Sequence, residues 1–207
     1  MSSSVHPLSE GHRRALEARA SRVDRLQTNF ANLWPDGIEL TIEIGCGHGH
    51  YLTAYAQQYS GEVCLGVDLV TRRIEKACAK RDKRQLSQLH FLKADAWECL
   101  DALPANVFLK RIFVLFPDPW PKSRHEKNRL LQHSLLDALS RKALPEARLD
   151  FRTDHEPIFA WASEQLATHS AWEPDPELEW PMEAPSYFQD LLGSYQSLTA
   201  RFIPSTG

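Results

Sequence analysis

The sequence has no run of about 18 apolar residues, and its first residues lack the apolar core of a signal peptide. We therefore expect a cytoplasmic protein with no segment that crosses a membrane. Only four cysteines are present, and none of them forms a C-x-x-C pair. This spacing indicates neither a zinc site nor a disulfide framework. The expected role of the cysteines is that of small, reduced core residues: Cys46, Cys64, Cys78 and Cys99.

Positive charge is almost missing from the last quarter of the chain. Residues 1–152 hold 23 of the 24 Lys and Arg against 18 acids, whereas residues 153–207 hold one against nine acids. The first part thus carries +5 and the second −8, within a total of −3. A polyanion could bind a basic face built from the N-terminal region and the middle of the chain. Ordinary solvated helix faces fit the same counts equally well.

The length of 207 residues and the hydrophobic content of 43% allow one α/β domain with a sizeable core. We expect a basic, helical N-terminal extension at 1–36, followed by the main domain at 37–207. Residues 8–30 have apolar side chains at helical spacing and arginines mostly off that stripe, so they predict a helix.

Apolar runs alternate with helical segments through the main domain. Strands are expected at 40–44, 63–67, 90–92, 112–116 and 149–151, and helices at 50–59, 71–84, 97–102, 126–143 and 156–169. This alternation predicts a Rossmann-like α/β fold, with a doubly wound, mostly parallel sheet and helices on both faces. Residues 172–185 are expected to form a loop, and 199–203 a last edge strand.

Glycines gather where the first expected strand meets the first crossover helix, in E-I-G-C-G-H-G. Gly45, Gly47 and Gly49 lie at this turn, where glycine lets the backbone approach a nucleoside closely. Because NAD enzymes use a related turn, the neighbouring residues decide between ligands. Glu43 lies near a buried strand end, where its carboxylate needs a cationic partner. Asp68 ends the second strand 23 residues after Gly45, close to the spacing of an acid that binds ribose hydroxyls.

Asp95 ends the third expected strand, in F-L-K-A-D-A, and suits a hydrogen bond from an adenine amino group. Acids at three successive strand ends suggest one site. They would repel the pyrophosphate of a dinucleotide, whereas S-adenosylmethionine carries a sulfonium, an ammonium and no phosphate. The sequence therefore favours S-adenosylmethionine as cofactor, and a methyltransferase over a dehydrogenase. Each acid could instead be only a helix N-cap.

The fourth expected strand leads into a stretch of prolines around Asp118. These prolines restrict the backbone where the strand leaves the sheet, so the carboxylate is expected to face the cleft. A purely structural turn could explain the prolines, but hardly Trp120 and the cationic or titratable side chains that follow. Trp120 suits stacking on a base and packing equally well.

At this point the chain resembles the tRNA (guanine-N7)-methyltransferase family. The resemblance rests on F-P-D-P-W-P-K-S-R-H-E-K-N-R-L at 116–130, on E-I-G-C-G-H-G and on R-T-D-H-E-P at 152–157, and it covers roughly residues 38–165. It implies the class I, S-adenosylmethionine-dependent fold and methylation of guanine N7 in the variable loop of tRNA. N7 carries an in-plane lone pair and is unprotonated at neutral pH, so alignment matters more than a strong base.

The resemblance also implies roles for individual residues. By motif position, the resemblance assigns Glu43, Asp68, Asp95 and Asp118 to the cofactor region. It also assigns Asp118 to the reaction centre, and Lys122 and Asp154 to the target nucleotide. RNA phosphates would be contacted by Arg124, His125, Lys127 and Arg129. Three features depart from the family's pattern: the N-terminal arginine-rich segment differs, Asp68 stands where Glu is common, and the T-x-x-E element is replaced. Its nearest counterpart here supplies Ser186 and Gln189 as candidate substrate contacts.

A metal site is not predicted, although His48, His50 and His155 make one conceivable, because the chemistry needs no metal and H-x-H alone is a weak signal. Alternatives to a tRNA methyltransferase are an enzyme acting on another RNA or on a small molecule, and a non-catalytic tRNA-binding relative. The partner expected is tRNA, and the chain is expected to be a monomer or a homodimer.

Overall fold

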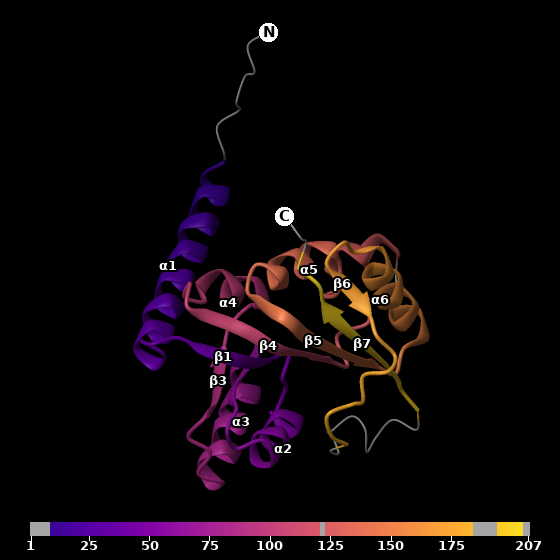
Figure 1. Cartoon of the computed structure of the whole chain (residues 1–207). Coiled ribbons are helices and arrows are strands. Elements are labelled where there is room, and N and C mark those ends of the chain that lie inside the picture. Colours follow the sequence, from indigo (N-terminus) through magenta and orange to yellow (C-terminus); the bar gives the residue numbers. More distant parts are fainter. Residues whose placement is uncertain (1–8, 121–122, 184–193, 205–207) are drawn as a thin grey trace.

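The computed structural model describes residues 9–120, 123–183 and 194–204. A seven-stranded sheet with the order β3-β2-β1-β4-β5-β7-β6 forms its centre (Figure 1). The strands are β1 (Ile38–Ile44), β2 (Val63–Asp68), β3 (Leu89–Lys93), β4 (Val107–Leu115), β5 (Ala143–Thr153), β6 (Trp172–Pro174) and β7 (Gln196–Phe202). The first five run parallel, and the chain order reverses between β1 and β4. This arrangement confirms the predicted doubly wound sheet and creates a crevice at the reversal.

Helices cover both faces of this sheet (Figure 1). One face packs against α2 (His50–Gln58) and α3 (Thr71–Lys83), and the other against α1 (Glu10–Leu33), α4 (Ala96–Ala102), α5 (His133–Ser140) and α6 (Glu156–Thr168). The alternation of side chains along β1 shows why both faces are covered. Leu40 and Ile42 point into the core below α4 and α5, whereas Glu43 points to the face of α2.

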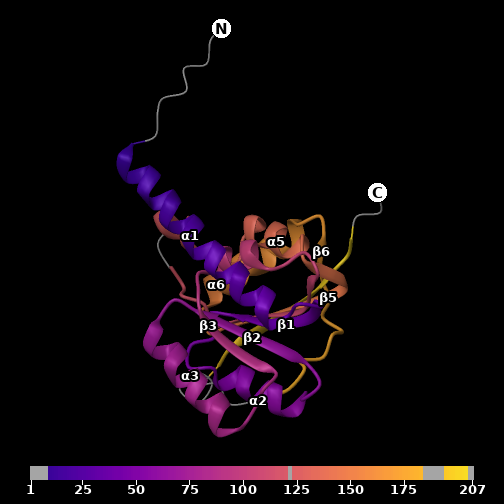
Figure 2. The same ribbon diagram turned by 90° about the vertical axis from the view of Figure 1, so that its left-hand side faces the viewer.

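The first helix is anchored by its C-terminal half. Leu26 and Phe30 are buried in the main core, and Arg22 forms an ion pair of 2.6 Å with Glu98 of α4. The N-terminal half extends away from the body of the molecule, and Leu16 is 47% exposed there (Figures 1 and 2). In the described part of the chain, no helix combines the length and the apolar composition of a membrane span.

Of the helix predicted at 126–143, only His133–Ser140 is an α-helix, α5. Residues Ser123–Asn128 form a short 3-10 helix, η1, and α5 begins only at His133. Gln132 separates the two because its backbone is extended, with φ −149° and ψ 165°. Its side-chain amide donates to the carbonyl of Arg129 at 2.9 Å, which satisfies an acceptor that a continuous helix would have paired. The end of the predicted helix, from Ala143 onward, belongs to β5.

Two predictions for the C-terminal part also need correction. The expected loop at 172–185 begins with strand β6, held by Trp172, whose indole NH donates to the Leu136 carbonyl at 3.2 Å. The expected edge strand at 199–203 is longer and is not at an edge, because β7 pairs antiparallel with β5 on one side and β6 on the other. Burial of a large aromatic ring thus outweighs the local Pro- and Glu-rich composition.

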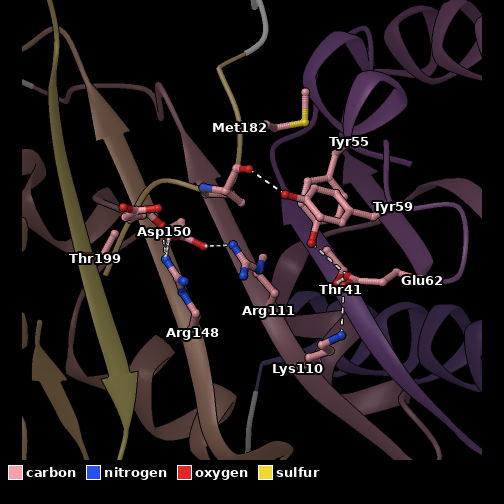
Figure 3. Close-up of polar contacts among 12 residues, drawn as sticks. Thr41, Tyr55, Tyr59, Glu62, Lys110, Arg111, Arg148, Asp150, Met182 and Thr199 are labelled. Carbon is pink, nitrogen blue, oxygen red and sulfur yellow. Dashed lines mark hydrogen bonds and ion pairs between the residues drawn. The ribbon is translucent and has the colours of Figure 1, made fainter. Parts of the chain in front are cut away.

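A polar layer lies on the α2 side of the sheet and extends from Tyr55 of α2 to Asp150 of β5 (Figure 3). Asp150 is fully buried there, and its carboxylate accepts hydrogen bonds from Arg111 and Arg148 at 3.3 Å each. Arg148 also donates to the backbone carbonyl of Glu179 at 2.7 Å. Beside this group, Glu62 accepts from Thr41, Tyr55 and Lys110. Through the hydrogen bond of Arg148 to Glu179, the layer therefore links the segment after β6 to the central strands.

Candidate active site

A cleft of about 700 Å³ opens at the carboxyl ends of β1, β2, β3 and β4. Its position is the point of chain reversal between β1 and β4, where open α/β sheets bind ligands. Its size lies within the range of about 300–1,000 Å³ that small-molecule sites occupy. Predicted residues from four separate segments line it: Glu43, Gly45, Gly47, Asp68, Asp95, Asp118, Lys127 and Arg129.

The glycine turn forms one wall of this cleft. Gly45, Gly47 and Gly49 have φ values of 78°, 55° and 65°, a region that other residues rarely adopt. A Cβ atom added to Gly45 or Gly47 would meet nothing within 4 Å, so the backbone there faces open space. Gly49 packs instead against Phe91, whose ring a Cβ would approach to 2.5 Å. At Gly45 and Gly47 the turn thus exposes backbone to the cleft, whereas at Gly49 it packs tightly against the protein interior.

Glu43 is the buried acid at the centre of the cleft. Its side chain is only 4% exposed, and its Oε2 atom has no hydrogen-bond partner among the described residues. Burial raises the pKa of Glu43 to about 8, a hydrogen bond from the Leu52 amide opposes this rise, and the nearby Asp68 carboxylate adds to it. An unpaired buried oxygen is costly, so the geometry suits a ligand that brings a proton donor or a positive charge.

Asp68, at the end of β2, is also buried, and it organises the glycine turn. One carboxylate oxygen accepts a hydrogen bond from the Gly47 amide at 3.0 Å and lies 3.4 Å from the Arg73 guanidinium. The other oxygen accepts from the Val70 amide at 2.8 Å. The carboxylate therefore links two walls of the cleft.

Asp95 combines a structural contact with a place in the cleft. Its carboxylate accepts hydrogen bonds from the amides of Trp97 and Glu98, at 2.9 Å and 3.3 Å. Asp95 is therefore the N-cap of α4, as the alternative interpretation of the sequence allowed. The side chain is half-buried and still lines the cleft.

The three acids and the glycine turn fit a nucleoside that carries positive charge. The carboxylate oxygen of Glu43 that has no partner among the described residues can accept a hydrogen bond from an ammonium group. The exposed glycine backbone allows close approach of a ribose. The same carboxylates would repel a pyrophosphate. In the described residues no group of three His, Cys, Asp or Glu side chains is placed to hold a metal ion.

The rim of the cleft beyond β4 carries Asp118. The chain turns there through Phe116, whose φ of 47° is unusual for a bulky residue and whose amide donates to the Arg152 carbonyl at 2.7 Å. Asp118 follows on this turn with an exposed side chain that lines the cleft, and Trp120, 38% exposed, lies beside it. Asp118 thus lines the same cleft as Glu43 and Asp68.

The basic run after Asp118 divides into residues with different environments. Lys127 is exposed and lines the cleft. Arg129 is only 8% exposed: its guanidinium lies 4.7 Å from the ring centroid of Trp161 and 3.5 Å from the Glu126 carboxylate. These contacts are those of a packing residue. Lys122 lies outside the described residues, and so do the side chains of Arg124 and His125.

Of the remaining substrate candidates the structure describes only Asp154, which is not among the residues that line the cleft. Asp154 follows β5 and is exposed, beside the strand end that precedes Asp118. Ser186 and Gln189 lie outside the described residues.

The structure adds Arg73, at the start of α3, to the residues that line the cleft. It also places His48 of the glycine turn there, which the sequence had considered only as a metal ligand. Arg152 does not line the cleft. It is buried at the end of β5, where it forms a bidentate ion pair with Glu183 at 3.0 Å, and its guanidinium lies 3.9 Å from the ring centroid of Trp180 and 4.3 Å from that of Tyr195. The only sequence signal for Arg152 was its place in the R-T-D motif.

Comparisons with known proteins agree with this geometry. A family model described as "Putative methyltransferase" matches residues 38–189. A tRNA (guanine-N(7)-)-methyltransferase from Caulobacter vibrioides is 30% identical over 65% of this chain and 59% of its own length. Another with the same name, from Lactobacillus gasseri, is 34% identical over 59% of this chain and 56% of its own. The chain therefore spans somewhat more than half the length of these relatives.

Solved structures share the fold. TrmN from Thermus thermophilus superposes with a TM-score of 0.57 at 16% identity, over 86% of this chain and 48% of its own. A variant of the 16S rRNA (adenine(1408)-N(1))-methyltransferase from Catenulisporales acidiphilia, solved with its cosubstrate SAM, gives a TM-score of 0.57 at 17% identity, over 87% and 93% of the two chains. At these identities the likeness shows a Rossmann-like, class I methyltransferase fold.

Proposed function

The chain belongs to the methyltransferase family whose model matches its residues 38–189, and from that premise we propose that it transfers the methyl group of S-adenosylmethionine to N7 of a guanine in tRNA. The substrate is inferred from relatives named tRNA (guanine-N(7)-)-methyltransferase. The observation that carries the proposal is the single cleft lined by buried Glu43 and Asp68, half-buried Asp95 and exposed Asp118.

Residues of three strand ends would hold the cofactor. Glu43 would accept a hydrogen bond from the cofactor's ammonium and thereby satisfy its orphaned oxygen. Asp68 would bind the ribose hydroxyls from its place beside the Gly47 amide, and the half-buried Asp95 would accept from the adenine amino group. When bound, S-adenosylmethionine supplies a methyl group on a positively charged sulfur, and its transfer places that charge on the purine.

Asp118 is the proposed catalytic residue. Its carboxylate lies on a restricted turn at the cleft rim, so it needs little rearrangement to stabilise the positive charge that develops on the purine. Asp118 or Asp154 would also accept the N1 and N2 hydrogens of guanine, a pattern that adenine cannot present. Since N7 is unprotonated at neutral pH, these residues act by alignment and electrostatics and no strong base is required.

The remaining contacts are proposed on the resemblance. Lys122, Ser186 and Gln189 would hold the target nucleotide, and Arg124, His125 and Lys127 would contact phosphates. For Arg129, burial against Trp161 favours support of this segment over direct contact with RNA. We also propose that the modified guanine lies in the variable loop and that the protein acts in the cytoplasm.

A single assay tests the proposal. Purified protein is incubated with unmodified bulk tRNA and labelled S-adenosylmethionine, and the digested nucleosides are analysed by mass spectrometry. The expected product is 7-methylguanosine, located in the chain by borohydride and aniline cleavage. A methyl group on another atom would refute the assignment. Cofactor binding without any RNA product would favour a small-molecule substrate or a non-catalytic relative.

A further inference from the structure

One helix beside the cleft has a positive net charge, although the net charge of the whole chain is negative. Residues 71–84, which form α3 and its C-cap, hold seven Lys and Arg against two acids, whereas the whole chain has a net charge of −3. Six of these cations make up what we call the α3 basic stripe: Arg72, Arg73, Lys76, Lys80, Lys83 and Arg84. The sequence motifs assigned no role to this helix beyond that of a crossover.

The stripe is a continuous, solvent-facing line. Its members recur three or four positions apart, so they share one side of the helix, while Ile74 and Ala77 are buried on the other. All six are exposed except Lys80, which is half-buried. At about 1.5 Å per residue the stripe extends for roughly 18 Å. Its length would allow it to follow several phosphates of a nucleic-acid backbone.

The stripe begins at the cleft itself. Arg73 lines the cleft together with His48 of the glycine turn. The Lys80 ammonium donates to the His48 carbonyl at 2.7 Å. Burial lowers the pKa of His48, and Lys76, Lys80 and Arg73 lower it further, which places all three cations around this turn.

Most of this charge is not neutralised within the protein. Arg73 lies 3.4 Å from the Asp68 carboxylate, but Arg72, Lys76 and Lys83 form no ion pair with another described residue. The carboxylates of Asp68, Asp95 and Asp118 line the cleft and repel the backbone of an RNA whose base enters it. Cations on the rim must offset that repulsion. Across the opening the described residues offer only Lys127, since Arg129 is buried.

We propose that the α3 basic stripe binds the phosphate backbone of the tRNA whose guanine enters the cleft. The proposal rests on the function proposed above and adds a second docking surface, on the α3 side of the cleft and separate from Lys127. The RNA strand would cross the opening, with phosphates on both rims and the target base between them. The contacts would be electrostatic and independent of base sequence.

The test compares two double variants of equal charge. Arg72→Ala/Lys76→Ala removes exposed cations of the stripe that do not line the cleft. Arg25→Ala/Arg141→Ala removes two exposed cations elsewhere, on α1 and after α5. Affinity for unmodified tRNA is measured by fluorescence anisotropy over a range of salt concentrations, and affinity for S-adenosylmethionine is measured by calorimetry. Arg72→Glu/Lys76→Glu serves as the charge-reversed variant.

The stripe variant should bind tRNA roughly tenfold more weakly at fixed salt. Its log-log salt slope should fall by roughly 1.5 to 2, about one unit for each phosphate that the variant no longer neutralises. The charge-reversed variant should bind still more weakly, whereas the control should keep the wild-type slope. Cofactor affinity and thermal midpoint should stay unchanged in all three.

Equal slopes in the stripe variant and wild type would overturn the docking surface while leaving the proposed function intact, provided that wild type still forms 7-methylguanosine. An equally weakened control variant would also overturn it, because the effect would then reflect net charge. No tRNA binding by wild type would overturn both proposals.

Discussion

At the scale of single residues, the chemistry of Glu43 depends strongly on the surrounding fold. Its pKa of about 8 lies far above its ordinary value of 4.5, chiefly because of burial. Between those two values the folded state therefore binds a proton that the unfolded chain has released. The free energy of unfolding should consequently fall as pH rises through this window, and level off above it.

Glu43→Gln should remove this pH dependence. The amide mimics the protonated acid, so the difference in stability between wild type and variant should grow from pH 5.5 to pH 8 in favour of the variant, a window taken from the pKa of about 8. Cofactor binding should show the opposite preference, because an ionised Glu43 pairs with the ammonium. Calorimetry in buffers of different ionisation enthalpy measures the protons released on binding. Equal proton release by both proteins would contradict the assignment of Glu43.

Asp118→Asn should lower the single-turnover rate of methyl transfer by roughly 100-fold or more, the scale on which a preorganised electrostatic contact acts. The amide keeps the size of the side chain and removes its charge. The affinity of the variant for tRNA should equal that of the wild type. Asp36→Asn, which neutralises an exposed acid before β1, is the matched control and should keep the wild-type rate. A rate reduction of only a few-fold in Asp118→Asn would mean that alignment alone carries the reaction.

On the scale of elements, the segment from η1 to α5 shows how environment separates two cations. Lys127 and Arg129 are separated by a single residue in the sequence, but Lys127 is exposed and Arg129 is buried. Lys127→Ala should weaken tRNA binding and reduce the salt slope by about one unit, with no change in thermal midpoint. Arg129→Ala should instead lower the midpoint, because it removes the contacts with Trp161 and Glu126. Differential scanning fluorimetry and anisotropy separate the two effects. A stable Arg129→Ala protein with weakened RNA binding would restore Arg129 as a phosphate contact.

Across the whole molecule, the polar layer couples the central strands to the C-terminal segment. Asp150→Ala would leave Arg111 and Arg148 without their buried counter-charge, so the free energy of unfolding should fall by about 3–5 kcal/mol, the usual cost of breaking a buried pair. Glu10→Ala, which removes an exposed pair with Arg14 on α1, should leave stability unchanged. Urea denaturation measures both. An equally small effect at Asp150 would show that water reaches this layer.

Local sequence patterns predicted the sheet and the cleft well, because both depend on short-range regularities. Apolar alternation and strand-to-helix order placed β1 to β5, and the glycine turn with Glu43, Asp68 and Asp95 marked the strand ends that form one cleft. The same patterns failed where a particular side-chain contact accompanies the departure from the pattern. Gln132 interrupts a helix by bonding backward to Arg129, and Trp172 forms a strand because its ring is buried under α5.

The sequence alone determined the fold class, the position of the cleft and the turn that carries Asp118, because each follows from residues adjacent in the chain. Only the tertiary structure decided which charges are available. It buried Arg129 while leaving Lys127 exposed, left one oxygen of Glu43 without a partner, and aligned the α3 basic stripe with the cleft. The physical reason is that burial and electrostatics depend on neighbours from other segments, and no spacing within one segment records them.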